Sequence, residues 1–224
     1  MDIALTLRLA LTTTAILLAV ATPLALWIAS RHTLTRRIVQ AIVALPLVLP
    51  PTVLGFYLLV GLGPLTAFGR LLIRIVGHPL AFTFTGLVIG SVIFSLPFAV
   101  QPLVAGFSSI DRNLIDTAGV LGASPWTVFR RIIAPLSRAA FLTSAVLTFT
   151  HTVGEFGVVL MLGGDIPGIT RTLSIAIYDQ VQEAQYAAAN RTALWLVALS
   201  FLALLAIYTR KTARDTSARE VSLE

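Results

Sequence analysis

Two ionisable side chains lie in an otherwise apolar stretch and could carry proton or ion chemistry. Glu155 is the single acid in residues 139–162, and His151 precedes it by four residues, a spacing that places both on one helix face. An ionisable group inside a membrane span is costly and usually marks function. Three interpretations of Glu155 stay open: a structural acceptor at a helix break near Gly154 and Gly157, a path-lining group, or a proton relay. Two ligands do not make a zinc centre, so no metal is expected.

Prolines gather in a second apolar run, residues 38–62, whose centre reads L-P-L-V-L-P-P-T-V-L-G. Each proline lacks an N–H, so several backbone carbonyls lose their helical partner. In lipid, such carbonyls must be covered by protein or face a water-lined cavity. We expect a broken helix beside a translocation path; a kink that only improves packing is the alternative. The candidates for the path or its gate are Pro46, Pro50, Pro51, Thr52, His151, Glu155 and Gly157.

A third polar set lies in the loop G-G-D-I-P-G-I-T-R-T, which contains Asp165, Thr170, Arg171 and Thr172. One cation between two hydroxyls suits a tetrahedral oxyanion or an acidic partner surface. A solvated loop arginine is the ordinary alternative. We expect this loop at the outer mouth of the path, where a binding partner would dock.

Other kinds of chemistry lack the residues they need. A Walker A loop requires a lysine after a glycine-rich turn, but the only lysine, Lys211, has no such turn before it. No G-x-S-x-G motif appears, and the absence of cysteine excludes disulfides and thiolate metal sites. We therefore expect a chain that is not an enzyme and holds no cofactor or nucleotide of its own.

The composition predicts the elements that position these residues. Of 224 residues, 57% are hydrophobic and 12% are charged, against about 25% charged in soluble domains. This predicts an all-α polytopic membrane protein. Five spans are expected, near residues 9–29, 38–62, 80–107, 139–162 and 192–208. A sixth is possible if residues 63–79, otherwise an interfacial amphipathic helix, or the segment after Thr172 enters the membrane. Residues 1–212 form one membrane domain, and 213–224 form a polar tail expected to be unstructured.

Basic residues predict the orientation. With the amino terminus outside, the inner segments hold most of the positive charge: Arg31, Arg36, Arg37, Arg112, Arg130, Arg131, Arg138, Arg210, Lys211, Arg214 and Arg219. The outer segments hold Arg8, Arg70, Arg74, Arg171 and Arg191. The carboxyl terminus and residues 111–136 are thus expected in the cytoplasm. The net charge of +6 reflects membrane topology, and no nucleic-acid partner is expected.

Residues 111–136, which we call the knob, carry charges and turn residues in an ordered pattern. Asp111 caps a first short helix, and Gly122 lies where a left-handed stop would end it. Ser124 then caps a second helix that has Pro125 in its first turn. Two explanations are open at this point, a docking element or an amphipathic loop on the bilayer surface.

The knob resembles the cytoplasmic "EAA" loop of ABC-importer permeases, whose pattern is Glu-Ala-Ala, then Gly, then Ile-x-Leu-Pro. Asp116-Thr117-Ala118 stands at the triplet, followed by Gly122, Ile132 and Pro135 at the matching spacing. Asp for Glu, Thr for Ala and Ala134 for Leu depart from the pattern. The resemblance implies a MetI-like fold in which this loop is the coupling helix seated on an ABC ATPase subunit. The implied contact residues are Asp116, Ala118, Gly122, Ser124, Pro125, Trp126, Phe129, Arg130, Ile132 and Pro135.

Within that family the chain is most similar to the molybdate permease type. The similar segments are L-P-L-V-L-P-P-T-V-L-G-F (45–56), V-G-E-F-G (153–157) and I-P-G-I-T-R-T (166–172). The resemblance implies a homodimeric inner-membrane channel for molybdate, supplied by an oxyanion-binding protein, with ATP and Mg²⁺ on the ATPase. A sulfate or tungstate permease is the alternative within the family, and a proton-coupled secondary transporter is the alternative outside it.

Overall fold

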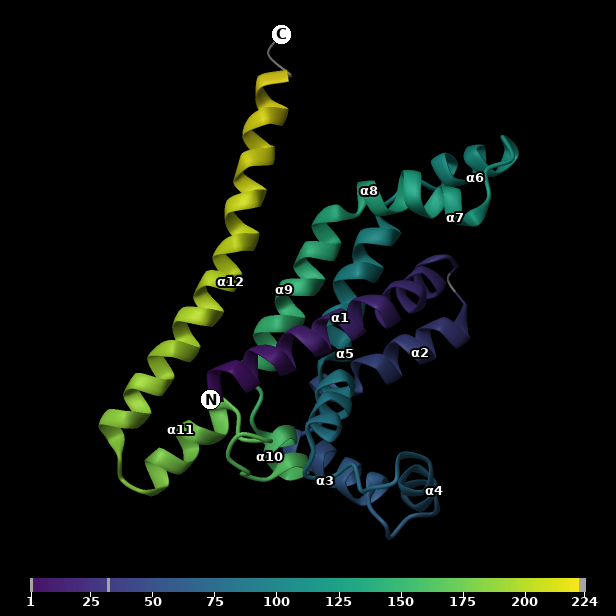
Figure 1. Ribbon diagram of the computed structural model, residues 1–224. Helices are drawn as coiled ribbons and strands as arrows, with labels where there is room; N and C mark the ends of the chain where they lie inside the picture. Colours follow the sequence, from purple (N-terminus) through teal and green to yellow (C-terminus); the bar gives the residue numbers. More distant parts are fainter. Residues whose placement is uncertain (1, 32, 222–224) are drawn as a thin grey trace.

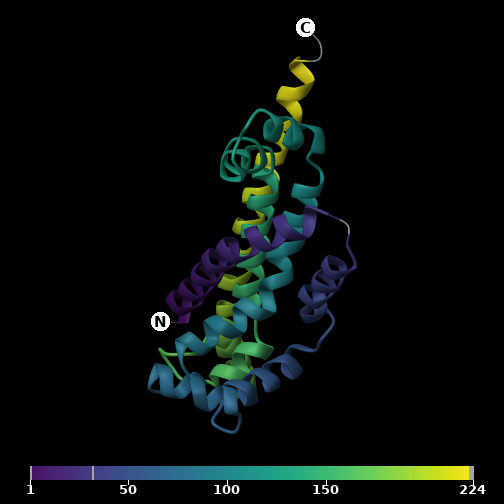
Figure 2. The ribbon, with the colours of Figure 1, turned by 90° about the vertical axis from the view of Figure 1, so that its right-hand side faces the viewer.

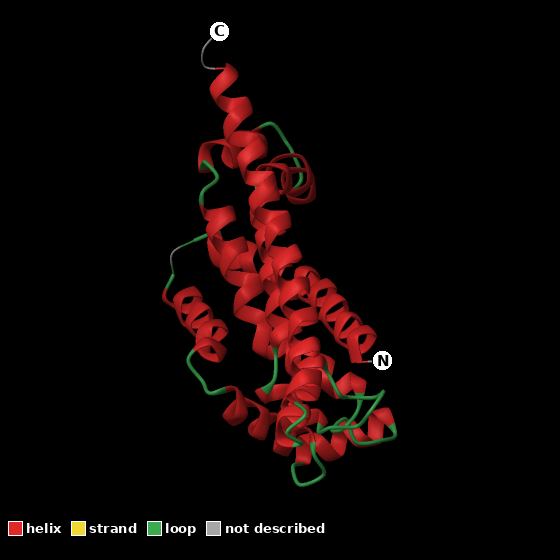
Figure 3. Ribbon diagram, turned by 90° about the vertical axis from the view of Figure 1, so that its left-hand side faces the viewer, coloured by secondary structure: helices red, strands yellow, loops and turns green. Residues whose placement is uncertain are grey.

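The computed structural model describes residues 2–31 and 33–221, and within them it contains helices and no strand (Figures 1 and 3). The all-α prediction is confirmed. The helices are α1 (Asp2–Ala29), α2 (Leu34–Ala44), a 3₁₀ turn (Leu45–Leu47), α3 (Pro51–Leu62), α4 (Ala67–Val76), α5 (Phe84–Ser108), α6 (Arg112–Val120), α7 (Pro125–Val128), a π-helical turn (Phe129–Ile133), α8 (Ala134–Leu136), α9 (Arg138–Gly154), α10 (Gly157–Gly163), α11 (Leu173–Gln182) and α12 (Tyr186–Val221).

The core lies where α1, α5 and α9 pack together. Its largest cluster joins Leu17, Ala21 and Ala25 of α1 to Val100 and Leu103 of α5, all fully buried. Small residues allow the helices to approach closely, as they do in membrane bundles. A Cβ placed on Gly106 of α5 would lie 2.3 Å from the Ala140 Cβ of α9, so this contact depends on glycine.

Three helical segments are long and apolar enough to cross a membrane: α1, α5 and residues Tyr186–Leu205 of α12. Two bent helix pairs raise the number to five if each pair is one span. The pairs are Leu34–Leu47 with Pro51–Leu62, and Pro125–Leu136 with Arg138–Gly154. The described residues provide no sixth candidate. Residues 63–79 fold as the short α4, whose exposed Phe68, Leu71 and Ile75 match the predicted interfacial helix.

The two spans in which the sequence predicts a helix break, residues 38–62 and 139–162, are both interrupted in the structure. The first, α2 with its 3₁₀ turn, meets α3 at 106°, and Pro46, Pro50 and Pro51 lie at the bend. The missing N–H groups of these prolines explain why the helix cannot continue. The expected span over residues 139–162 is likewise divided, because α9 ends at Gly154 and α10 begins at Gly157.

The last helix differs from the prediction. A span near 192–208 followed by an unstructured tail was expected, but α12 continues without a break from Tyr186 to Val221. The polar residues 209–221 include Arg, Lys, Ala and Glu, which are good helix formers, and extending an existing helix avoids the cost of nucleation. Residues 222–224 of the predicted tail lie outside the described residues.

The knob and the helices around the proline cluster lie at opposite ends of the molecule. In Figure 2 the knob and the carboxyl-terminal part of α12 lie at the top, whereas α3, α4 and α10 lie at the bottom. Arg112 at the start of the knob donates a hydrogen bond to the carbonyl of Ala29 at the end of α1, 3.4 Å away. The basic 30–37 loop therefore begins beside the knob.

Candidate functional site

The two interrupted spans meet at a cavity of about 550 Å³ lined by Pro51, Thr52, Phe94, Thr150, His151, Gly154, Glu155, Phe156 and Gly157. We call it the Glu155 cavity. It brings together five residues predicted separately as path or gate candidates: Pro51, Thr52, His151, Glu155 and Gly157. The other two lie apart from its lining, since Pro46 is buried in the 3₁₀ turn and Pro50 caps α3.

Glycines allow the starts of α3 and α10 to touch. A Cβ on Gly157 would lie 2.7 Å from the Pro51 Cβ, and one on Gly55 would lie 2.7 Å from the Met161 Cβ. Real Cβ atoms do not approach this closely, so a side chain at either position must push the two helices apart. The V-G-E-F-G motif and the proline cluster therefore act as one packing unit.

Glu155 is buried, with 3% of its surface exposed. Its backbone carbonyl accepts a hydrogen bond from the Ser174 hydroxyl, which ties the break to α11. Both side-chain oxygens are shielded from solvent, and their nearest polar neighbour is the buried Ser91 hydroxyl of α5, outside strict hydrogen-bond geometry. The structural contact at the break is thus made by the backbone of Glu155, while its buried carboxyl group neighbours Ser91 of α5.

His151 is held by neighbours other than Glu155. Its Nδ1 lies 2.9 Å from the Ser95 hydroxyl, which in turn lies 3.1 Å from the Thr152 hydroxyl. The imidazole stacks on Phe98, with ring centroids 3.9 Å apart. Within the described part of the chain, no hydrogen bond or ion pair joins His151 to Glu155, so this conformation contains no acid–imidazole relay.

Sequence reasoning missed the α5 side of this site. From α5, Phe94 lines the cavity and Ser95 and Phe98 orient the imidazole. Thr150 of α9, also unpredicted, completes the lining. A usable signal was present, because Ser91 and Ser95 are four residues apart in an apolar stretch of sequence. Both are fully buried in the structure.

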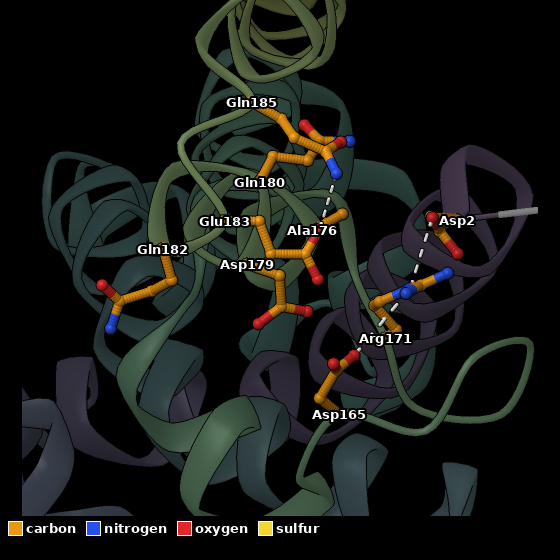
Figure 4. A pocket seen from close by; sticks show the side chains of 9 residues that line it. All are labelled: Asp2, Asp165, Arg171, Ala176, Asp179, Gln180, Gln182, Glu183 and Gln185. Atoms are coloured by element: carbon orange, nitrogen blue, oxygen red, sulfur yellow. Dashed lines mark hydrogen bonds and ion pairs between the residues drawn. The ribbon is translucent and has the colours of Figure 1, made fainter.

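The outer-mouth candidates form a second cluster, which we call the Arg171 cleft (Figure 4). The Arg171 Nε lies 3.6 Å from an Asp2 carboxylate oxygen and 3.8 Å from one of Asp165. The cleft has a volume of about 370 Å³, and its lining also includes Asp179 and Glu183. With four acids around one arginine, this surface attracts cations or basic groups more readily than a free oxyanion.

The two threonines of the predicted oxyanion set point inward. Thr170 is fully buried, and its hydroxyl accepts a hydrogen bond from the Ile166 N–H at 3.1 Å. Thr172 is also buried and shares a hydrogen bond of 2.9 Å with Ser174. In this conformation both threonines close the loop, and Arg171 pairs with carboxylates instead of presenting an open anion site.

The acids of the cleft influence one another. Asp165, through a shared hydrogen bond, raises the pKa of Asp179 to about 6, with smaller contributions from burial and from the negative charge of Asp165. Arg171 acts in the opposite direction. Asp179 therefore changes its charge in mildly acidic solution.

The knob has the predicted local structure. The Asp111 carboxylate accepts from the Asn113 N–H at 3.0 Å, and the Ser124 hydroxyl accepts from the Thr127 N–H at 3.3 Å. Gly122 joins the two helices with φ of +81°, a left-handed conformation that favours glycine. Asp111 provides the cap of α6, and Asp116 lies on the exposed surface of that helix.

A wide turn continues the second helix of the knob. The N–H of Ala134 donates to the carbonyl of Phe129, five residues earlier, within the π-helical turn Phe129–Ile133. Pro135 follows directly and has no N–H to donate. The wide turn accommodates the proline ring, which would otherwise clash with the preceding turn of an α-helix.

The tip of the knob is apolar and exposed. Val120 is 89% exposed, Leu121 82% and Trp126 67%. The Trp126 and Phe129 rings stack with centroids 5.6 Å apart. Val120 and Leu121 lie between the predicted contact residues Ala118 and Gly122, within the stretch from Ala118 to Arg131 that the sequence predicts as the contact surface. An exposed apolar group of this kind is typical of a docking surface.

Interrupted helices around a cavity, with an exposed apolar knob at one end, are consistent with a membrane transport permease. Residues 21–214 match the family described as binding-protein-dependent transport system inner membrane component, and the chain belongs to this family. Its fold class and its resemblance to ABC-importer permeases are thereby confirmed.

Curated relatives of this chain include several molybdenum permeases and a probable sulfate permease. The chain is 50% identical over 209 residues to the molybdenum transport system permease protein ModB of Azotobacter vinelandii, covering 93% of this chain and 92% of that protein. It is 33% identical over 181 residues to ModB of Escherichia coli K12, covering 80% and 79%. A probable sulfate transport system permease of Chlorella vulgaris is 29% identical over 182 residues, covering 81% and 68%.

Solved structures share the fold at low identity. A bacterial alginate ABC transporter in complex with a periplasmic protein matches with TM-score 0.73 and 21% identity, covering 92% of this chain and 75% of that one. The MetNI methionine ABC transporter matches with TM-score 0.70 and 18% identity, covering 95% and 94%. These likenesses support the architecture and carry no substrate information.

Proposed function

We propose that this chain is the membrane-spanning channel subunit of an ATP-driven importer that translocates molybdate. The observation that carries the proposal is the 50% identity to a molybdenum permease over 93% of the chain. The arrangement of the V-G-E-F-G and L-P-P-T segments around one cavity supports it, since these two segments carry the resemblance to molybdate permeases. Family membership favours this function over a proton-coupled secondary transporter.

The knob is proposed to dock on a separate ABC ATPase subunit, which holds the ATP and Mg²⁺. Its exposed Val120, Leu121 and Trp126 would fill an apolar groove of that subunit, and Arg130 would lie at the polar rim. Two copies of the chain are proposed to enclose the path, each with its own ATPase subunit.

The opposite end is proposed to receive an oxyanion-binding protein. The Arg171 cleft offers exposed carboxylates there, which suit lysine or arginine side chains on the rim of a partner. In this proposal the amino terminus lies on the outer side of the inner membrane, and the knob and the carboxyl terminus lie in the cytoplasm. The excess of basic residues near the knob supports that orientation.

The Glu155 cavity is proposed as part of the path. Its lining residues include two threonines, His151, apolar rings and one acid, Glu155, but no lysine or arginine. Such a lining binds an anion weakly, as a path must if the anion is to leave again.

The substrate is tested by competition. The chain, its ATPase and its binding protein are reconstituted in vesicles, and uptake of radiolabelled molybdate is measured with excess unlabelled molybdate, tungstate or sulfate. We expect molybdate and tungstate to suppress uptake and equimolar sulfate to leave most of it. If sulfate alone competes, the molybdate assignment is wrong and a sulfate permease replaces it.

A further inference from the structure

His151 lies where the Glu155 cavity meets the buried contact between α5 and α9. It is one of the lining residues, yet its Nδ1 is turned to the hydroxyl of Ser95, 2.9 Å away, and Ser95 is fully buried outside the lining. Phe98 stacks on one face of the ring. The Nε2 atom makes no hydrogen bond within the described residues and, unlike the side-chain oxygens of Ser91 and Glu155, it is not sealed from solvent. The Nε2 edge is therefore the part of the imidazole that reaches the cavity.

The hydroxyls behind the ring determine which of its nitrogens carries the hydrogen. The Thr152 hydroxyl donates its only hydrogen to the carbonyl of Thr148, 2.9 Å away. Toward Ser95, at 3.1 Å, Thr152 can then only accept, so the Ser95 hydroxyl donates to Thr152. Ser95 in turn can only accept from His151, so the ring hydrogen lies on Nδ1. A neutral imidazole carries one N–H, which leaves Nε2 with a bare lone pair.

Two aromatic rings hold the imidazole in this orientation. Its centroid lies 3.9 Å from that of Phe98 and 4.8 Å from that of Phe94. A rotation that turned Nε2 toward Ser95 would have to sweep through the space that these rings occupy. No hydrogen bond or ion pair within the described residues joins the imidazole to a carboxylate, so no acid partner there stabilises a doubly protonated ring. Packing and hydrogen bonds together select one nitrogen for the cavity.

We propose that the Thr148–Thr152–Ser95 series of hydrogen bonds fixes the tautomer of His151, so that the path offers a passing oxyanion a hydrogen-bond acceptor here and not a donor. The role toward the anion rests on the proposed function, whereas the tautomer does not depend on the substrate. A fully ionised tetrahedral oxyanion has only acceptor oxygens, so it finds no partner at Nε2 and is not retained. With the hydrogen on Nε2, the same ring would donate a strong, charge-assisted hydrogen bond. Ser95 and Thr152 are thus positioning residues that act through His151.

The tautomer is measured by nitrogen NMR of the whole complex in lipid vesicles, in which only this chain contains isotope-labelled histidine. The chain has three histidines, and the His151 signal is the one lost in His151→Gln. Wild type should show a hydrogen on Nδ1 and none on Nε2. Ser95→Ala removes the acceptor, and Thr152→Val frees the Ser95 hydrogen to point at Nδ1, so both should move the ring hydrogen to Nε2. Ser144→Ala is the matched control, since it removes another buried hydroxyl between α9 and α5, one that donates to the Ala99 carbonyl at 2.9 Å.

Anion retention tests the consequence for transport. The same complexes are incubated with radiolabelled molybdate and passed through a desalting column. Wild type and Ser144→Ala should retain almost none. Ser95→Ala and Thr152→Val should retain about tenfold more, and take it up more slowly in vesicles, because Nε2 then donates to the charged oxyanion. Adding His151→Leu to Ser95→Ala should abolish the extra retention.

Each measurement can overturn the proposal. A wild-type ring with its hydrogen on Nε2, or with hydrogens on both nitrogens, refutes the fixed tautomer. A tautomer that moves in the variants without extra retention refutes the role in anion release, and so does extra retention that persists when His151→Leu is added. If Ser95→Ala does not assemble, Thr152→Val, which keeps the side-chain volume, carries both measurements.

Failure of the proposed function has a different signature. In that case wild-type vesicles take up no molybdate at all, while the NMR signal still decides the tautomer. If wild type transports molybdate and the variants show no change in retention, only the role of His151 is refuted.

Discussion

At the scale of single residues, the contact between Gly157 and Pro51 holds the two broken spans together. Gly157→Ala would place a Cβ 2.7 Å from the Pro51 Cβ, so α3 and α10 must separate. We expect a loss of stability of about 1–3 kcal/mol, measured as a lower midpoint of thermal unfolding in detergent. Gly61→Ala is the matched control, because a Cβ there meets nothing within 4 Å. Equal losses in both variants would contradict the close packing.

The raised pKa of Asp179 predicts that the stability of the fold around the Arg171 cleft depends on pH. Its pKa is raised from 3.8 to about 6, so the folded cleft binds a proton more tightly than the unfolded chain does. The resulting stabilisation is complete below about pH 4 and is lost as the pH rises through 6. Asp179→Asn should remove this component, so the unfolding midpoint should change less between pH 4 and 7 than in wild type. An identical pH profile in the variant would contradict the assignment to Asp179.

At the scale of elements, the knob depends on the left-handed turn at Gly122. A β-branched residue is strained at φ of +81°, at a cost of about 1–2 kcal/mol, whereas asparagine tolerates this conformation. We expect Gly122→Val to reduce association with the ATPase about tenfold in co-purification, while Gly122→Asn retains most of it. Since a Cβ at Gly122 meets no atom within 4 Å, backbone strain alone separates the two variants. Normal association of Gly122→Val would refute the role of the turn.

Local chemistry explains which elements were predictable from the sequence. The knob was predicted because its caps, Asp111 and Ser124, bind N–H groups two or three residues away. The broken span followed from three prolines that cannot donate. The end of α12 was missed because a polar segment with good helix formers continues an existing helix as readily as it frays.

Long-range contacts explain what the sequence could not predict. The threonines at positions 170 and 172 were expected to face a ligand, but the loop around them is closed from the other end of the chain. The Thr6 hydroxyl accepts the Leu173 N–H at 2.9 Å, across 167 positions of sequence. Asp2 pairs with Arg171 in the same region. The α5 side of the Glu155 cavity was missed for the same reason, since Ser95 meets His151 only in the folded bundle.

At the scale of the whole molecule, the two ends should bind different partners (Figure 2). Trp126→Glu places a charge on the exposed apolar tip of the knob, where Trp126 is 67% exposed. It should abolish co-purification with the ATPase without unfolding the chain. Phe68→Glu is the matched control, since Phe68 is 59% exposed on α4 at the opposite end and should leave the association intact. Loss of the ATPase in the Phe68 variant alone would reverse the assignment of the two ends.

The central claim, that this chain conducts molybdate with energy supplied by another subunit, has one direct test. Radiolabelled molybdate uptake is measured in vesicles containing this chain and the binding protein, with and without the ATPase subunit, with ATP or with only an imposed proton gradient. We predict uptake that requires both the ATPase and ATP. Uptake that persists without the ATPase and follows the proton gradient would contradict the account.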